Sequence, residues 1–121
     1  MKNIYFIQPS SYYGGEICLP YAAGALAAYA WKNDEIKDNY CLADIIYRKD
    51  SAEICFEKIA EPFLIAFSCY IWNFEHNKLL AKQLKEKFPD SLILFGGHSV
   101  SNTSSELMEE CDFIDFLIHE E

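Results

Sequence analysis

Basic side chains are scarce in this chain. Its 121 residues include 10 lysines and arginines against 19 aspartates and glutamates, which gives a formal net charge of −9 at pH 7. A protein that binds a nucleic-acid backbone needs a lysine- and arginine-rich surface to neutralise the phosphates. The charge balance therefore argues against nucleic acid as a partner. It favours a role of the acidic side chains in solubility or in contact with a basic partner.

Closely spaced cysteines are missing as well. The five cysteines lie far apart, and no two of them have the C-x-x-C spacing of a zinc or redox site. We therefore expect no metal site, and mostly buried free thiols in a reducing cytoplasm: Cys18, Cys41, Cys55, Cys69 and Cys111.

Long apolar runs are also absent. The longest, 21–31, is well short of the ~20 residues that a membrane helix needs. The N-terminus lacks the apolar length of a signal peptide. Since 51% of the residues are apolar, the chain has enough hydrophobic side chains for one packed core. We expect a single cytoplasmic domain that does not enter a membrane.

Short apolar runs alternate with helical patterns along the chain. Strands are predicted at 4–7, 40–47, 63–67, 92–95 and 113–118, and helices at 21–31, 50–60, 73–88 and 103–110. Continuous apolar strands that alternate with helices are typical of a parallel sheet covered on both faces. The prediction is a doubly wound, flavodoxin-like (Rossmann-like) α/β domain with five strands in the order 2-1-3-4-5. The run 63–67 is the most hydrophobic and is expected at the centre.

The boundaries of the helices carry recognisable signals. Pro20 precedes the first helix, where a first turn tolerates proline. Asp50 and Thr103 each stand three residues before a glutamate, which resembles a capping box, and Asn73 can cap the helix that follows it. No helix follows the last strand, so we expect an exposed flank of the sheet and a chain shorter than its natural parent.

Polar and small residues follow the strands that should border the ligand crevice. In this topology ligands bind beyond the carboxyl ends of strands one, three and four, here 9–11, 68–70 and 96–99. Paired glycines after a buried strand let main-chain N–H groups approach a ligand, although a plain tight turn needs them equally often. Ser68 adds a hydroxyl group, and Cys69 is expected to be a buried, inert thiol.

Other uses of this fold fit the same loops poorly. A phosphorelay receiver needs acidic residues after strands one and three, but Gln8-Pro9 and Ser68-Cys69 stand there. A flavodoxin needs a Ser/Thr-rich phosphate loop leading directly into the first helix, and 10–15 is too long and too aromatic for it, although a small flavin protein stays open. No G-x-G-x-x-G motif is present, and no Ser/His/Asp arrangement is evident.

Four segments, in order, resemble a known family. They are 19–30 (LPYAAGALAAYA), 67–73 (FSCYIWN), 94–101 (LFGGHSVS) and 113–120 (FIDFLIHE). Together they are similar to the N-terminal cobalamin-binding domain of cobalamin-dependent radical S-adenosylmethionine (SAM) enzymes. This group includes anaerobic magnesium-protoporphyrin monomethyl ester cyclase-like proteins and many methyltransferases.

The resemblance implies a domain organisation. Residues 1–121 correspond to a cobalamin-binding-like domain, the N-terminal fragment of a longer radical SAM protein. The rest of such a parent is a barrel that binds S-adenosylmethionine and a 4Fe-4S cluster through a C-x-x-x-C-x-x-C motif, which this chain lacks.

The resemblance also implies roles for particular residues. Ser68 and Tyr70 would line the slot for the nucleotide tail of cobalamin, and Gly96 and Gly97 would let the tail pass between strand and helix. The remaining expected cofactor-binding residues lie beside the slot or at its rim: Ser10, Cys69, His98 and Ser99.

One departure from related domains concerns the lower cobalt ligand. Methionine-synthase-type domains place D-x-H-x-x-G after strand one, whereas this chain reads QPSSYYG over 8–14, without a histidine. We therefore expect cobalamin to bind without a lower histidine ligand. Four aromatic residues near the strand ends either stack on the corrin or cap the core: Tyr12, Tyr13, Tyr70 and Trp72.

The function expected from this combination is a cofactor-binding module without catalytic residues of its own. It would present methyl- or hydroxocobalamin to the barrel of a methyltransferase or cyclase that acts on a small molecule. The alternative is a degenerate, cofactor-free scaffold or substrate-gating domain. A slot open between Ser68 and Gly97 favours the first, and a slot filled by Tyr12, Tyr13 or Trp72 favours the second.

Overall fold

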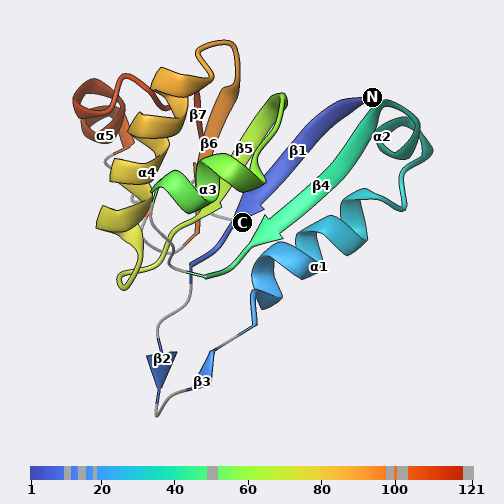
Figure 1. Cartoon of the computed structure of the whole chain (residues 1–121), viewed down its shortest axis with the longest axis horizontal. Helices are drawn as coiled ribbons and strands as arrows, with labels where there is room; N and C mark the ends of the chain where they lie inside the picture. Colours follow the sequence, from blue (N-terminus) through green and yellow to red (C-terminus); the bar gives the residue numbers. More distant parts are fainter. Residues whose placement is uncertain are drawn as a thin grey trace.

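Five parallel strands form the main sheet of the computed structural model, which describes residues 1–9, 12–13, 16–17, 19–48, 52–97, 100 and 104–118. The strand order is β4-β1-β5-β6-β7, which is 2-1-3-4-5 when only the strands of this sheet are counted along the chain. Every neighbouring pair is parallel. The predicted flavodoxin-like α/β fold is therefore confirmed (Figure 1).

The elements follow the predicted alternation of strands and helices. In chain order the sheet and its helices are β1 (Lys2–Ile7), α1 (Tyr21–Ala30), α2 (Asp34–Asn39), β4 (Tyr40–Ile46), α3 (Ala52–Lys58), β5 (Pro62–Ser68), α4 (Phe74–Lys87), β6 (Leu92–Gly96), α5 (Ser104–Glu110) and β7 (Phe116–Leu117). The most hydrophobic strand, β5, occupies the centre of the sheet, as expected. A short antiparallel hairpin, β2 (Tyr12–Tyr13) and β3 (Glu16–Ile17), projects beyond the carboxyl end of β1 (Figure 1).

The main core lies on one face of the sheet, under α3 and α4. Alternate residues of a strand point to the same face, so Ile65 and Phe67 of β5 face the same side as Ile93 and Phe95 of β6. These four side chains are at most 2% exposed. They belong to one buried cluster with residues of α3, of α4 and of the position directly after α3, namely Cys55, Ile59, Leu80, Ala81 and Leu84.

The opposite face is covered only in part. Its buried residues Ile4 and Ala66 stand outside the main cluster, as do Ala23 and Ala27, the two buried positions of α1. Helix α1 lies beside β4, away from β6 and β7 (Figure 1). Over β7 the apolar side chains are open to solvent, since Phe116 is 50% exposed and Ile118 is 53% exposed. The exposed flank predicted from the sequence is thus present among the described residues.

Some elements differ from the prediction. The last strand was expected over 113–118 but is only Phe116–Leu117, because a turn in which Ile114 N donates to Cys111 O holds the chain before it. Helix α2 and the β2–β3 hairpin were not predicted. The α2 signal was present in the sequence, since Asn33 caps this helix through its side chain, which accepts from Glu35 N and Ile36 N.

The structure tests one of the helix caps predicted from polar side chains. Asn73 stands at the N-cap position of α4, but its side chain makes no capping bond to the helix, because its amide is used elsewhere. Asp50 and Thr103 lie outside the described residues. Within the described ranges, no helix has the length and apolar character required to cross a membrane.

Candidate functional site

The carboxyl ends of β5 and β6 lie side by side. Ser68 pairs with Gly96 in the sheet register, and Cys69 N donates to Gly96 O at 2.7 Å. The segment 68–70 and the glycine pair 96–97 therefore meet at one edge of the sheet, as the predicted topology requires. Three of the expected cofactor-binding residues lie outside the described part of the chain: Ser10, His98 and Ser99.

Gly97 is a glycine that the fold itself requires. Its φ of +105° lies in a region that side chains disfavour. A Cβ at this position would lie 2.6 Å from Cys69 O and 2.8 Å from Cys69 N. The loop after β6 therefore packs directly on the main chain after β5, and this contact explains Gly97 without a ligand.

Gly96 is different, because the contacts around it allow a side chain. A Cβ here would meet Ile118 Cβ at 3.7 Å, which is ordinary van der Waals contact. In the register, Gly96 stands beside Ser68, and Ser68 points to the same face as Ala66. Ala66, Ser68 and Gly96 thus form a strip of small residues that reaches the carboxyl edge on the face that carries α1. Small side chains let another group approach the main chain closely, and Ile118 is the described residue that borders Gly96.

Cys69 is a buried thiol with little nucleophilic character. It is 0% exposed. Burial raises the pKa of its thiol to about 12, against the smaller lowering effects of hydrogen bonds from the Asn77 side chain and the Gly96 main chain. The thiolate is the reactive form of cysteine, so this residue packs rather than reacts.

A stacked aromatic pair stands next to Cys69. The rings of Tyr70 and Trp72 are 4.7 Å apart between centroids and 3° from parallel. Trp72 is 44% exposed, and Ile71 between them is 88% exposed. The turn after β5 therefore presents a flat, apolar surface at the carboxyl edge. The side chains of Tyr12 and Tyr13 are outside the described part of the structure, so their expected roles stay predictions.

Two buried asparagines hold this edge together; the sequence indicated only a capping role for Asn73, and Asn77 was not singled out. Asn73 is 1% exposed and Asn77 is 0% exposed. Asn73 Nδ2 donates to Pro9 O at 2.9 Å and to Ser68 O at 3.1 Å, so it joins β1 to β5. A signal for Asn77 was available: it falls on the apolar stripe of α4 with Leu80 and Leu84, where a polar residue needs a reason.

The end of β1 carries a third buried amide. Gln8 is 9% exposed, and its Oε1 accepts from Ala23 N at 2.9 Å in the first turn of α1. Its own N–H donates to Ile46 O at 2.9 Å. Gln8 therefore fixes α1 and β4 to the end of β1, and its side-chain oxygen is already bonded within the fold.

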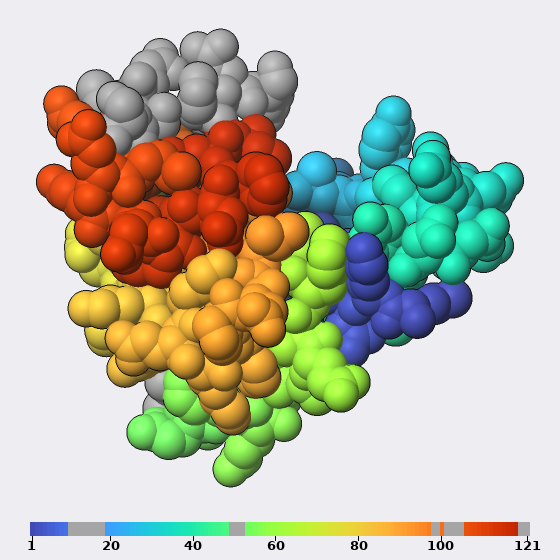
Figure 2. Space-filling view, turned by 90° about the horizontal axis from the view of Figure 1, so that it is seen from above, coloured from blue at the N-terminus to red at the C-terminus, as the bar shows by residue number. Residues whose placement is uncertain are grey.

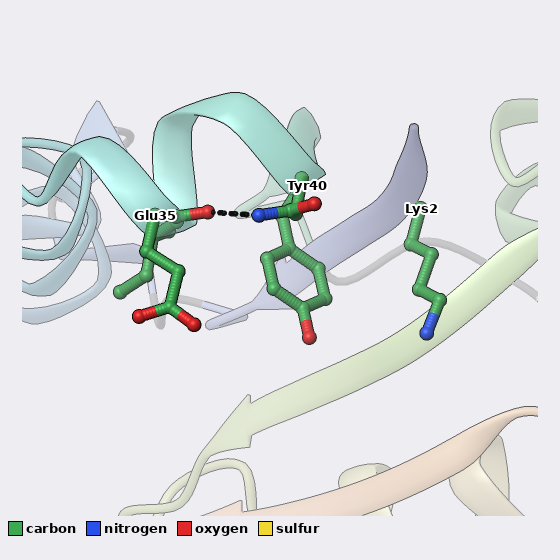
Figure 3. Close-up of a pocket in the computed structure, with 5 residues that line it drawn as sticks. Lys2, Glu35 and Tyr40 are labelled. Atoms are coloured by element: carbon green, nitrogen blue, oxygen red, sulfur yellow. Dashed lines mark hydrogen bonds between the residues drawn. The ribbon is translucent and has the colours of Figure 1, made fainter.

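A separate pocket lies at the other end of the sheet, near the start of β1 (Figure 3). It has a volume of about 430 Å³ and lies between Lys2 and helix α2, where Asn39 Nδ2 donates to Glu35 O at 2.7 Å. Helix α2, which lines the pocket, lies at one side of the molecule, apart from β5, β6 and α4 (Figure 2). None of the expected cofactor-binding residues lines this pocket. Throughout the described part of the chain, no three His, Cys, Asp or Glu side chains are grouped to hold a metal ion.

Comparison with known proteins relates the chain to two methyltransferases. No family model matches it. It is 30% identical over 120 residues to the cobalamin-dependent radical SAM methyltransferase TokK of Streptomyces tokunonensis, which is 99% of this chain and 17% of the relative. It is 29% identical over 103 residues to the 2-(S-pantetheinyl)-carbapenam-3-carboxylate methyltransferase of Streptantibioticus cattleyicolor, which is 85% of this chain and 15% of the relative.

The extent of these matches is informative. The chain spans 17% and 15% of the length of the two relatives, so it matches one domain-sized segment of each. Nearly the whole chain takes part in the first match. The predicted resemblance is therefore confirmed: along its length this chain is similar to a segment of cobalamin-dependent radical SAM methyltransferases.

Proposed function

We propose that this chain is the cobalamin-binding module of a radical SAM enzyme of methyltransferase or cyclase type. The observation that carries the proposal is the strip of small residues at the carboxyl edge, where Ser68 and Gly96 stand side by side on the incompletely covered face. Ligands of doubly wound sheets bind at this edge. The similarity of nearly the whole chain to a cobalamin-dependent methyltransferase supports the same ligand.

The described residues fit the two parts of such a cofactor. The nucleotide tail would lie over Ser68 and Gly96, since among the described residues a Cβ at position 96 would meet only ordinary van der Waals contacts with Ile118. The Tyr70–Trp72 stack is flat and partly exposed, which suits contact with the planar corrin. His98 and Ser99 would lie near the rim of the site, and Ser10 on the loop after β1. Bound cobalamin would supply a cobalt that can carry a methyl group, and the residues of the chain would orient it.

The lower face of the corrin would receive no histidine from the loop after β1. The sequence 8–14 contains none, and the first polar side chain there, Gln8, is bonded to Ala23 N. We therefore propose that cobalamin binds without a lower histidine ligand.

The rest of the proposed enzyme follows from the family resemblance described in the sequence analysis. A parent chain would add a barrel that binds S-adenosylmethionine and a 4Fe-4S cluster, and would act on a small molecule in the cytoplasm. In that arrangement residues 1–121 form the cobalamin-binding domain, and the barrel is its partner.

A second candidate is a cofactor-free scaffold or substrate-gating domain. The contact of Gly97 with the main chain of Cys69 favours it, because half of the glycine pair is explained by packing alone. The two candidates differ in one measurable property, the ability to hold a corrin.

Reconstitution with hydroxocobalamin separates the candidates. The purified chain is incubated with excess hydroxocobalamin and passed over a gel-filtration column, and the visible spectrum of the protein peak is recorded. We expect corrin absorbance to co-elute at about one equivalent. Variants Gly96→Ala and Trp72→Ala should lower the amount bound, whereas Leu79→Ala, an exposed residue of α4, should not. Absence of corrin from the protein peak would favour the scaffold instead.

A further inference from the structure

A single side chain connects three segments of the carboxyl edge. Asn73 Nδ2 donates to Pro9 O after β1 and to Ser68 O at the end of β5. Asn73 Oδ1 accepts from Tyr70 N at 2.8 Å. The strand order reverses between β1 and β5, and this is where doubly wound sheets bind ligands. Asn73 therefore closes the fold at the place where the proposed site begins.

The same residue shapes the turn that carries the aromatic pair. Asn73 N donates to Tyr70 O at 3.1 Å, so Asn73 bonds Tyr70 through both its main chain and its side chain. Ile71 and Trp72 lie between these bonds and are exposed. The orientation of the Tyr70–Trp72 stack relative to β1 thus depends on the amide of Asn73.

Asn77 holds the amide of Asn73 in place. Its Nδ2 lies 3.3 Å from Asn73 Oδ1, 3.3 Å from Ser68 O and 3.5 Å from Cys69 Sγ. Its own Oδ1 is buried and has no hydrogen-bond partner among the described residues. Each acceptor oxygen that Asn77 reaches already has a second donor, from Asn73 or Tyr70. An apolar residue would avoid the cost of the unpaired oxygen, so stability alone does not explain Asn77.

We propose that Asn73, held by Asn77, is a positioning residue that fixes the Tyr70–Trp72 stack against the end of β1 and so preforms the surface that receives the corrin. The identity of the ligand rests on the proposed function, whereas the role of Asn73 in holding the stack does not. A preformed surface binds more tightly because less ordering is needed on association.

Trp72 itself provides a probe of this positioning. The chain has two tryptophans, so in a Trp31→Phe background the fluorescence comes from Trp72 alone. In that background we compare Asn73→Ala and Asn77→Leu with Asp115→Ala. Asp115 is a matched control because it lies near the amino end of β6, away from the carboxyl ends of the strands. Its Oδ2 accepts from Ile93 N at 2.9 Å and from Lys85 Nζ at 2.8 Å. Asn73→Ser serves if Asn73→Ala does not fold.

In the Asn73 variants we expect a lower fluorescence anisotropy of Trp72 and a dissociation constant for hydroxocobalamin that rises about tenfold or more. Asn77→Leu should show the same changes to a smaller extent. Asp115→Ala should change neither quantity, even where it lowers the melting temperature equally. Normal anisotropy and normal binding in a folded Asn73 variant would overturn the proposal. If no variant and no parent protein binds hydroxocobalamin but the anisotropy still falls, the positioning role stands and the proposed function fails.

Discussion

Gly97 and Cys69 approach each other so closely that only a hydrogen atom fits between the Cα of Gly97 and the Cys69 carbonyl. A Cβ on Gly97 would stand 2.6 Å from that oxygen, while a Cβ on the adjacent Gly96 would meet its nearest described neighbour, Ile118 Cβ, at 3.7 Å. The two glycines therefore have separable roles. Gly97 maintains the contact between the segments after β5 and β6, whereas the described neighbours of Gly96 leave space for a Cβ.

Alanine substitution at these two positions should affect stability very differently. Gly97→Ala is expected to lower the free energy of unfolding by about 2 kcal/mol or more, because it adds a clash to an unfavourable φ. Gly96→Ala should stay within about 1 kcal/mol of the parent. Urea denaturation of both variants measures this difference, and equal losses would contradict the distinction.

Replacing each buried asparagine with leucine should change the stability of the chain by different amounts. Asn73→Leu leaves Pro9 O and Tyr70 N without their side-chain partner, so we expect a loss of about 2–4 kcal/mol. Asn77→Leu removes an oxygen that has no partner among the described residues, and both oxygens that its amide reaches keep another donor, so its stability should lie within about 1 kcal/mol of the parent or above it. Thermal unfolding of the two variants provides the comparison. A large loss in Asn77→Leu would show that its amide stabilises the fold directly.

The thiol of Cys69 gives a pH-dependent prediction. Its pKa is raised from 9.0 to about 12 in the folded chain, so the folded state keeps its proton between these values while the unfolded state loses it. The contribution of Cys69 to stability is thus fully present below about pH 9 and falls as the pH rises toward 12. The stability difference between the parent and Cys69→Ala, measured at pH 8 and at pH 10.5, should therefore shrink at the higher pH. A difference that does not change with pH would refute the assignment.

Alkylation offers an independent check on the same thiol. In the native chain at pH 8, Cys69 should react with iodoacetamide far more slowly than Cys41, which is partly exposed. Peptide mapping after a timed reaction distinguishes the two cysteines. Comparable rates would mean that the loop after β5 opens readily.

Gln8 should stabilise the first turn of α1. Gln8→Ala removes the acceptor for Ala23 N, and we expect a loss of about 1–2 kcal/mol together with faster amide exchange at Ala23. Gln8→Glu keeps an acceptor oxygen and should retain most of the exchange protection. Hydrogen exchange followed by NMR resolves this amide, and unchanged protection in Gln8→Ala would show that the bond contributes little.

The layers of this fold could be predicted because local sequence specifies them. The apolar runs at 63–67 and 92–95 and the periodicity of α4 identify strands and helices without reference to distant residues. The β2–β3 hairpin has only two residues in each strand, and such short strands leave no periodic pattern. The length of the last strand was overestimated because 113–118 is mostly apolar, although a turn occupies its beginning.

The candidate site was less predictable, since its organising contacts are long-range. Asn73 precedes a helix, which makes it look like a cap in the sequence, yet its amide bonds Pro9, 64 positions away. The different constraints on Gly96 and Gly97 arise from their neighbours in space, Ile118 and Cys69. Sequence reasoning located the correct edge of the sheet, but the contacts that hold it together required the structure.

The edge strand β7 affects how the protein should be handled. This strand has two residues, Phe116 and Leu117, and borders the sheet beside β6, where Phe116 is 50% exposed and leaves an apolar surface at the edge of the sheet. Concentrated preparations of the 121-residue chain will therefore tend to self-associate, and light scattering should increase with protein concentration. Replacing Phe116 with glutamine, which removes an exposed apolar ring, is a practical way to obtain samples suitable for spectroscopy.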